Sequence, residues 1–117
     1  MISTIFIAFI GLLHVYILIL EMFLWDKSPG RKAFGHSQEM ASESKVLAAN
    51  QGLYHGFLAA GLFWGLYLGT AGVDIKVFFL GCIVIAGVYG GITAKIKILY
   101  IQALPALIGL ALLFLNL

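Results

Sequence analysis

The chain has 117 residues, of which 62% are hydrophobic and only 10% are charged. A soluble domain carries about 25% charged residues, so this chain has too few to cover a surface that faces water. The composition therefore excludes a soluble protein, and the length allows no more than one domain. We expect a single membrane domain over residues 1–117, located in the cell membrane, with the lipid bilayer as its main partner.

Four apolar runs are each long enough to cross about 30 Å of hydrocarbon as a helix, which takes about 20 residues. The runs cover residues 2–25, 46–70, 77–94 and 98–116. Charged breaks separate them, and the alternating segments of a membrane β-barrel are missing. The sequence thus predicts an all-α fold, a multi-pass four-helix bundle. Within the last run, Pro105 has no N–H to donate to the carbonyl of Ile101, so a kink or a loosened turn is expected there.

The basic residues predict how the chain is oriented in the membrane. Six of the seven Lys and Arg residues lie in the first and third connections, namely Lys27, Arg31, Lys32, Lys45, Lys95 and Lys97. The second connection holds only Lys76. The positive-inside rule places the first and third connections in the cytoplasm and both termini on the other side. Such short basic segments suit anionic lipid headgroups, and no nucleic-acid partner is expected.

The longer cytoplasmic connection follows the first helix. Its stretch "DKSPGRKAFG" (residues 26–35) is typical of turns, and Pro29-Gly30 is expected to break any helix. Ser37 is a suitable N-cap for a second helix that begins near Gln38 and projects into the cytoplasm before entering the membrane.

Small residues recur four positions apart in the second and third runs. Examples are Gly52-xxx-Gly56, Gly61-xxx-Gly65 and Gly87-xxx-Gly91. Such pairs form flat strips on which another helix can approach closely in lipid. The pattern fits packing within the chain and formation of a homo-oligomer equally well.

Polar residues interrupt the apolar runs at matching depths. Counted from the loops at about 1.5 Å per residue, one layer lies about 6–9 Å below the cytoplasmic boundary and a second about 15–17 Å below it. The first layer holds Glu21, Asn50, Gln51, Tyr89 and Gln102, and the second holds His14 and His55. Tyr54 shares one face of the second helix with Asn50, Gln51 and His55. Ionisable groups in a membrane are expensive, so these eight residues form a candidate ligand-binding site.

Each of these residues also has a plain structural interpretation. The three amides can serve as interhelical contacts, and each imidazole can bond a backbone carbonyl. Glu21 can instead pair with Lys45 or Lys97. Several other aromatic residues lie nearer the interfaces and are expected to form the aromatic belts; they are Tyr16, Trp25, Trp64, Tyr67 and Tyr100.

Several stretches carry a family resemblance over essentially the whole chain. They are "HVYILILEMFLW", the Phe34-Gly35 pair, "KVLAANQGLYHGFLAAGLFWG" and "IQALPALIGLALL". In these the chain resembles the bacterial membrane proteins grouped as domain of unknown function 1304. The resemblance implies a protein of this length with four membrane spans, and it implies no reaction.

Three functions fit the pattern. The first is a site that binds or transports a small polar or cationic solute, or a proton, in the cytoplasmic half of a homo-oligomer. The second is an intramembrane enzyme for a lipophilic substrate, with Glu21, His14 and His55 as acid and base. The third is a structural or accessory subunit. We assign no catalytic residue, cofactor or metal site, since a metal held by His14, His55 and Glu21 would need ligands from different depths.

Overall fold

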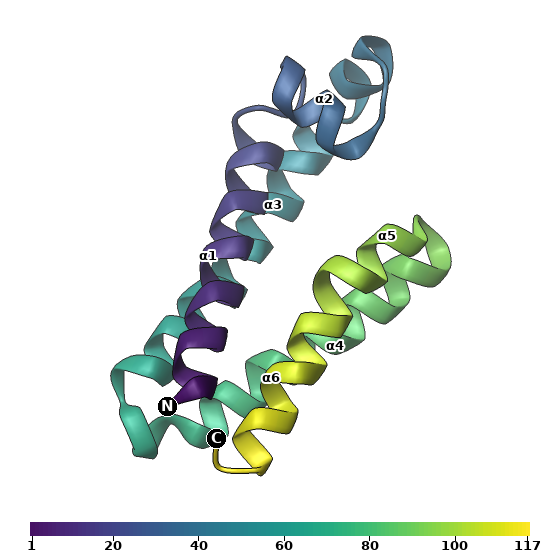
Figure 1. Ribbon diagram of the computed structural model, residues 1–117. Coiled ribbons are helices and arrows are strands. Elements are labelled where there is room, and N and C mark those ends of the chain that lie inside the picture. Colours follow the sequence, from purple (N-terminus) through teal and green to yellow (C-terminus); the bar gives the residue numbers. More distant parts are fainter. The chain divides into compact units, whose positions relative to one another are not determined.

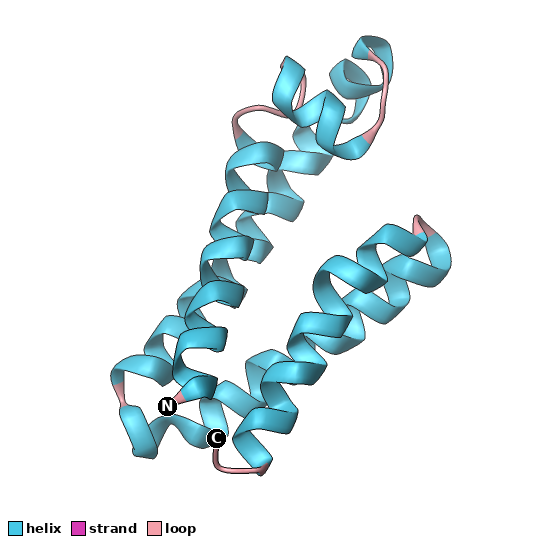
Figure 2. Cartoon of the chain, viewed as in Figure 1, coloured by secondary structure: helices cyan, strands magenta, loops and turns pink.

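The computed structural model describes all 117 residues, and nearly all of them lie in helices (Figures 1 and 2). The helices are α1 (Ile2–Met22), α2 (Ser28–Phe34), α3 (Gln38–Tyr67), α4 (Val73–Thr93), α5 (Ile96–Ile98) and α6 (Leu104–Phe114). A 3₁₀ turn, Gly69–Gly72, precedes α4, and a π-helical turn, Leu99–Ala103, joins α5 to α6. There are no strands, so the predicted all-α class is confirmed.

Three helical stretches are long and apolar enough to cross a membrane. They are Ile2–Met22, Gly69–Thr93 and Ile96–Phe114, which correspond to the first, third and fourth predicted spans. The second predicted span lies in α3, which is 30 residues long. Its polar residues, among them Asn50, Gln51 and His55, lower the apolarity of this helix. The membrane class is confirmed, and the fourth crossing stays a prediction.

The chain forms two compact units. The first, which we call the terminal unit, consists of Met1–Gly11 and Ala60–Leu117, and the second, the hairpin unit, consists of Leu12–Ala59. The largest fully buried aliphatic side chains lie in the terminal unit; they are Ile7, Ile10, Leu62, Leu80 and Ile83. The two chain ends meet there, because the amino group of Met1 donates to the carbonyl oxygen of Leu117 at 2.8 Å.

Glycines allow close helix packing in the terminal unit. A Cβ at Gly87 of α4 would lie 2.9 Å from the Cα of Ala103, so the backbones touch at this point. A Cβ at Gly61 of α3 would collide with the ring of Phe79. Both glycines belong to the small-residue strips seen in the sequence. These strips therefore serve packing within the chain.

The turn before Pro105 is loosened, as predicted. The five residues Leu99–Ala103 adopt π-helical geometry directly before α6, in which Pro105 lies in the first turn. The N–H of Leu104 donates to the carbonyl of Leu99, five residues earlier. Widening the helix in this way makes room for a proline ring that would otherwise meet the carbonyl of Ile101.

The cytoplasmic connection differs from the prediction. Pro29 does not prevent a helix, because α2 begins at Ser28 and Pro29 lies in its first turn. Proline is well tolerated there, since its missing N–H would have had no partner within the helix. Gly35 ends α2 in a left-handed conformation (φ 66°), and its N–H donates to the carbonyl of Arg31 at 2.8 Å.

The start of α3 matches the prediction. The helix begins at Gln38, and the N–H of Met40 donates to the Ser37 hydroxyl oxygen at 3.1 Å. Ser37 therefore caps the helix, satisfying one of the backbone donors that the first turn leaves unpaired.

Lys76 lies inside a helix, which is a second difference from the prediction. It was assigned to the second connection, yet α4 begins at Val73 and Lys76 is only 6% exposed. A Cβ at Gly65 would lie 2.6 Å from the Lys76 Cγ, so the lysine stem packs over this glycine. Lysine can bury its methylene stem in this way.

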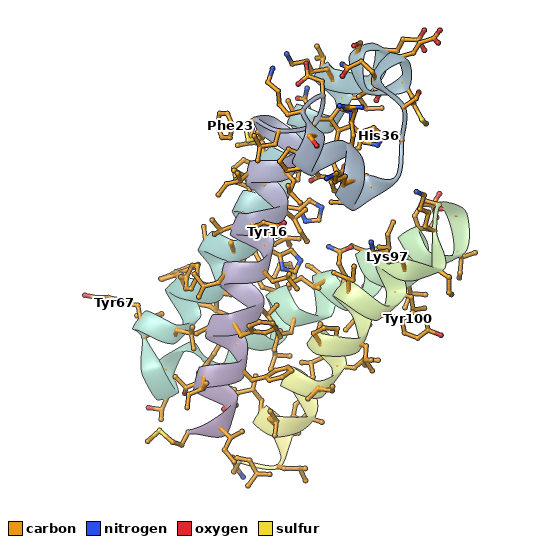
Figure 3. The ribbon with its side chains drawn as sticks, turned by 45° about the horizontal axis from the view of Figure 1, so that its top comes forward. Tyr16, Phe23, His36, Tyr67, Lys97 and Tyr100 are labelled. Carbon is orange, nitrogen blue, oxygen red and sulfur yellow. The ribbon has the colours of Figure 1, made fainter.

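Aromatic side chains point outward where belts were expected. Tyr67 is 87% exposed and Tyr100 is 60% exposed, and each extends away from its helix (Figure 3). A phenol in such a position can place its ring among lipid headgroups.

An ion pair joins the end of α1 to α3 within the hairpin unit. Lys45 Nζ lies 3.2 Å from Asp26 Oδ2, and Lys27 Nζ lies 3.8 Å from Asp26 Oδ1. The hydrogen bond from Lys45 holds the pKa of Asp26 below its ordinary value of 3.8, and the charge of Lys27 acts in the same direction.

We expect the Lys45→Met variant to raise the pKa of Asp26 toward 3.8. The pKa of Asp26 is lower in the folded state than in the unfolded state. The pair therefore stabilises the fold fully when the pH is above the unfolded-state pKa, and this stabilisation is lost as the pH falls through the folded-state pKa. Titration of the Asp26 side-chain carbon by NMR measures the change. Lys32→Met on α2 is the matched control, and an equal shift in both variants would contradict the assignment.

Candidate functional site

Glu21 lies in the last turn of α1, where α1 and α3 approach each other closely in the hairpin unit. Gly52 of α3 faces it, and a Cβ at Gly52 would lie 3.0 Å from the Glu21 Cβ and 3.3 Å from the Leu18 carbonyl oxygen. Because glycine has no side chain, the two helices can approach closely here. As a result Glu21 is buried, with 7% of its surface exposed.

Two histidines lie beside Glu21 in the same unit. His55 Nε2 is 3.5 Å from Glu21 Oε1, and both side chains are less than a tenth exposed. The His14 and His55 rings lie 5.4 Å apart between centroids, at an angle of 38°. His14 is completely buried. The acid and both imidazoles therefore form one cluster, which we call the Glu21 cluster.

Loop counting placed Glu21 and His55 in different layers, and this part of the prediction was wrong. Six residues of offset correspond to about 9 Å along a helix. However, helix side chains lean toward the N-terminus of their own helix. In the antiparallel α1 and α3, Glu21 leans toward His55 and His55 leans back toward Glu21. The two side chains thus close a gap that backbone depth alone leaves open.

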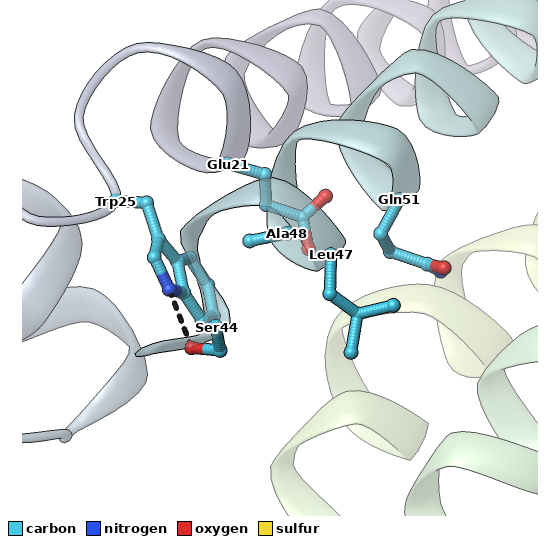
Figure 4. Close-up of a pocket in the computed structure, with 6 residues that line it drawn as sticks. All are labelled: Glu21, Trp25, Ser44, Leu47, Ala48 and Gln51. Atoms are coloured by element: carbon cyan, nitrogen blue, oxygen red, sulfur yellow. Dashed lines mark hydrogen bonds between the residues drawn. The ribbon is translucent and has the colours of Figure 1, made fainter. Parts of the chain in front are cut away.

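A pocket of about 280 Å³ opens beside the cluster (Figure 4). All of its lining residues belong to the hairpin unit; they are Glu21, Trp25, Ser44, Leu47, Ala48 and Gln51. The indole N–H of Trp25 donates to the Ser44 hydroxyl oxygen at 3.0 Å, and Ser44 donates to the Met40 carbonyl at 2.7 Å. These bonds fix the orientation of Trp25 and Ser44 at the pocket wall.

One oxygen of the Glu21 carboxyl group has no hydrogen-bond donor. Glu21 Oε1 is buried, and the nearby His55 Nε2 is not aligned to make a hydrogen bond with it. A buried polar atom without a partner costs free energy, and such atoms in native proteins call for an explanation.

Only some of the predicted residues of α3 join this site. Asn50 and Gln51 are both exposed; Gln51 lines the pocket, whereas the Asn50 amide donates to the carbonyl of Val46 on its own helix at 2.9 Å. Tyr54 is 61% exposed and packs edge-on against Phe57. Within the single chain the Asn50 and Tyr54 side chains are therefore exposed, and their place in a ligand site stays a prediction.

Gln102 and Tyr89 belong to the terminal unit. Gln102 is buried at 6% exposure in the π-helical turn, and Tyr89 is 70% exposed on α4. Burial of Gln102 fits the plain interpretation of this amide as a packing contact. Its place in a ligand site, like that of Tyr89, stays a prediction.

An aromatic cluster that the sequence did not suggest stands next to the pocket. The Trp25 ring lies 4.2 Å from the His36 ring and 4.8 Å from the Phe34 ring, between centroids. His36 Nε2 also lies 3.2 Å from the Trp25 carbonyl oxygen. His36 follows shortly after α2 and lies at the end of the hairpin unit that carries this helix (Figure 3). The Phe34-Gly35 pair, which ends α2, was noted in the sequence only as part of the family resemblance and not as part of an aromatic cluster.

The side chains that could act as metal ligands are not arranged to hold a metal ion. No group of three or more His, Cys, Asp or Glu side chains has an arrangement that could hold one. This includes the set of His14, His55 and Glu21, so the metal form of the enzyme hypothesis receives no support from the geometry.

The fold and the site define an all-helical membrane protein that buries a carboxyl–imidazole cluster beside a pocket. The chain belongs to the family described as protein of unknown function (DUF1304), whose model matches residues 8–114. It is similar to uncharacterized protein YpaA of Lactococcus lactis subsp. lactis (strain IL1403), at 29% identity over 103 residues, or 86% of this chain and 87% of the relative. No solved structure matches the chain. The resemblance drawn from the sequence is confirmed, and arguments about function depend on the site.

Proposed function

We propose that the protein binds a small polar or cationic solute, or a proton, at the Glu21 pocket and transports it through the membrane. The observation that carries this proposal is the position of Glu21. Glu21 lines the pocket, and one of its carboxyl oxygens is buried without a hydrogen bond. A cation or a hydrogen-bond donor in the pocket would pair with this carboxyl group and offset the cost of burying it.

The orientation proposed for the chain opens this pocket toward the cytoplasm. The hydrogen bond between Met1 and Leu117 supports a topology in which both termini lie on the same side of the membrane. Such a topology needs an even number of crossings, which three spans cannot provide. We infer that α3 is the fourth span, since residues 46–67 cover about 33 Å at 1.5 Å per residue. The positive-inside rule then places α2 in the cytoplasm and both termini outside.

Transport needs more protein than the two helices that border the pocket. We therefore retain the homo-oligomer in the proposal, with a pathway completed by a second copy.

The test is solute flux into proteoliposomes. Protein reconstituted in vesicles is assayed with a pH-sensitive dye, with sodium and with radiolabelled methylammonium. We expect Glu21→Gln to lower the flux at least about tenfold, since a hydrogen bond to a charged group contributes about 1.5–3 kcal/mol. Glu43→Gln, which removes an exposed carboxyl group from the same unit, is the matched control. Flux that is absent for every probe, together with no Glu21-dependent binding, would overturn the proposal.

A second candidate function is favoured by the distance between Glu21 and His55. At 3.5 Å, the two groups are close enough to exchange a proton once a substrate adjusts their alignment. An intramembrane enzyme would use them as acid and base on a lipophilic substrate. The two functions differ in their products, because an enzyme alters a lipid extract chemically and a transporter only moves its solute. Mass spectrometry of lipids incubated with the wild type and with Glu21→Gln separates them.

A further inference from the structure

We propose that the ligand of the Glu21 pocket is a small organic ammonium ion with a short apolar chain. This inference depends on the proposed function and makes it more specific, because it selects one chemical class from among polar solutes, inorganic cations and protons. It is drawn from the polar groups of the pocket, from its volume and from its apolar lining.

The small number of oxygen ligands in the pocket argues against a bare inorganic cation. Calcium takes six to eight oxygen ligands, and magnesium requires an octahedral set. The pocket offers the carboxyl group of Glu21, the amide of Gln51 and the hydroxyl of Ser44. The Ser44 oxygen already accepts from Trp25 and donates to Met40. One carboxyl group with few further hydrogen-bond acceptors suits an ammonium group, which needs acceptors and one counter-charge.

The walls and the volume argue for an apolar body attached to that charge. Beyond its polar members, the pocket is lined by Trp25, Leu47 and Ala48, and its volume of about 280 Å³ far exceeds that of a single ion. Apolar surface of this kind favours methylene groups over water. A neutral polar solute would bring no positive charge to the Glu21 carboxyl group.

Trp25 supplies a specific preference for a cation. An indole ring attracts an ammonium ion within about 6 Å of its face. Trp25 is held in place on two sides, by the hydrogen bond to Ser44 and by contacts with Phe34 and His36. Figure 4 shows Trp25 and Glu21 as two lining residues of the same pocket, with Trp25 hydrogen-bonded to Ser44. A carboxyl group and a fixed indole on the same small pocket are the combination that organic cations require.

The test measures binding of primary alkylammonium chlorides, from methyl to pentyl, to the full chain in nanodiscs by isothermal titration calorimetry. We expect the affinity to rise by up to about fourfold for each methylene group until the pocket is full. The neutral alcohol of equal length should bind at least tenfold more weakly than the amine. Glu21→Gln should remove this preference, whereas Glu43→Gln should keep it. Comparing variants in identical nanodiscs cancels partitioning of the amines into lipid.

The outcomes separate the two proposals. Amine binding that depends on Glu21 and on chain length supports the inference. If sodium, potassium or a proton binds in a Glu21-dependent manner and butylammonium does not, the ligand class is wrong and the proposed function stands. If none of these probes binds in a Glu21-dependent manner, both are overturned. Circular dichroism of Glu21→Gln tests whether the variant is folded. Trp25→Phe keeps an aromatic ring, so it should lower the affinity for the amine by only about twofold to fivefold.

Discussion

Replacing Gly87 with alanine is expected to destabilise the terminal unit by about 1–3 kcal/mol, the usual range for overfilling a packed interior. The Cβ of the new residue would lie 2.9 Å from both the Cα and the Cβ of Ala103 and would collide with the Ala103 backbone nitrogen. Backbone atoms cannot move aside as a flexible side chain can. The helix that carries Ala103 would therefore have to shift away from α4.

Gly81 provides a matched control on the same helix, since a Cβ there meets nothing within 4 Å. Both substitutions gain the same helix propensity, about 0.8–1 kcal/mol per Gly→Ala change, so their difference isolates the collision. Unfolding by SDS in mixed micelles, followed by circular dichroism, measures both free energies. Equal stability of the two variants would show that α4 and the Leu99–Ala103 turn are not in close contact.

Local features of the fold could be predicted from the sequence because their causes lie within a few residues. Ser37 caps α3 through a bond to the N–H of Met40, three residues away. The effect of Pro105 depends only on its own missing N–H and on the preceding turn. The apolar runs follow directly from the free energy of placing side chains in lipid. Pro29 was misjudged because proline breaks a helix interior but not a helix start.

The site was less predictable, because side-chain direction and helix partners are decided by tertiary packing. Residue counting selected Glu21, Gln51, His14 and His55, which the structure places close together in the hairpin unit, yet it assigned the acid and the imidazoles to different depths. A helical wheel shows which face is polar but does not show which face meets a neighbour. Asn50 illustrates this limit, since its amide bonds a carbonyl of its own helix and needs no partner on another.

Gly52→Ala is expected to disrupt the site without removing any of its functional groups. The new Cβ would lie 2.7 Å from the Met22 Cγ, 3.0 Å from the Glu21 Cβ and 3.3 Å from the Leu18 carbonyl oxygen. The backbone of α1 would have to move away from α3, which would lengthen the 3.5 Å separation between Glu21 and His55. We expect butylammonium binding to weaken about tenfold, equivalent to about 1.4 kcal/mol.

Gly56→Ala on the same helix separates this effect from a general response to a bulkier residue. A Cβ at Gly56 approaches only the end of the Leu18 side chain, at 2.6 Å from Cδ1, and a leucine tip can rotate away. We expect this variant to bind butylammonium within about threefold of the wild type, since its α1 backbone need not move. NMR of the His55 ring reports on the same event independently, with a shift expected in Gly52→Ala alone. If the two variants bind equally and neither moves the His55 resonance, the close approach of α1 and α3 at Gly52 does not control the position of Glu21.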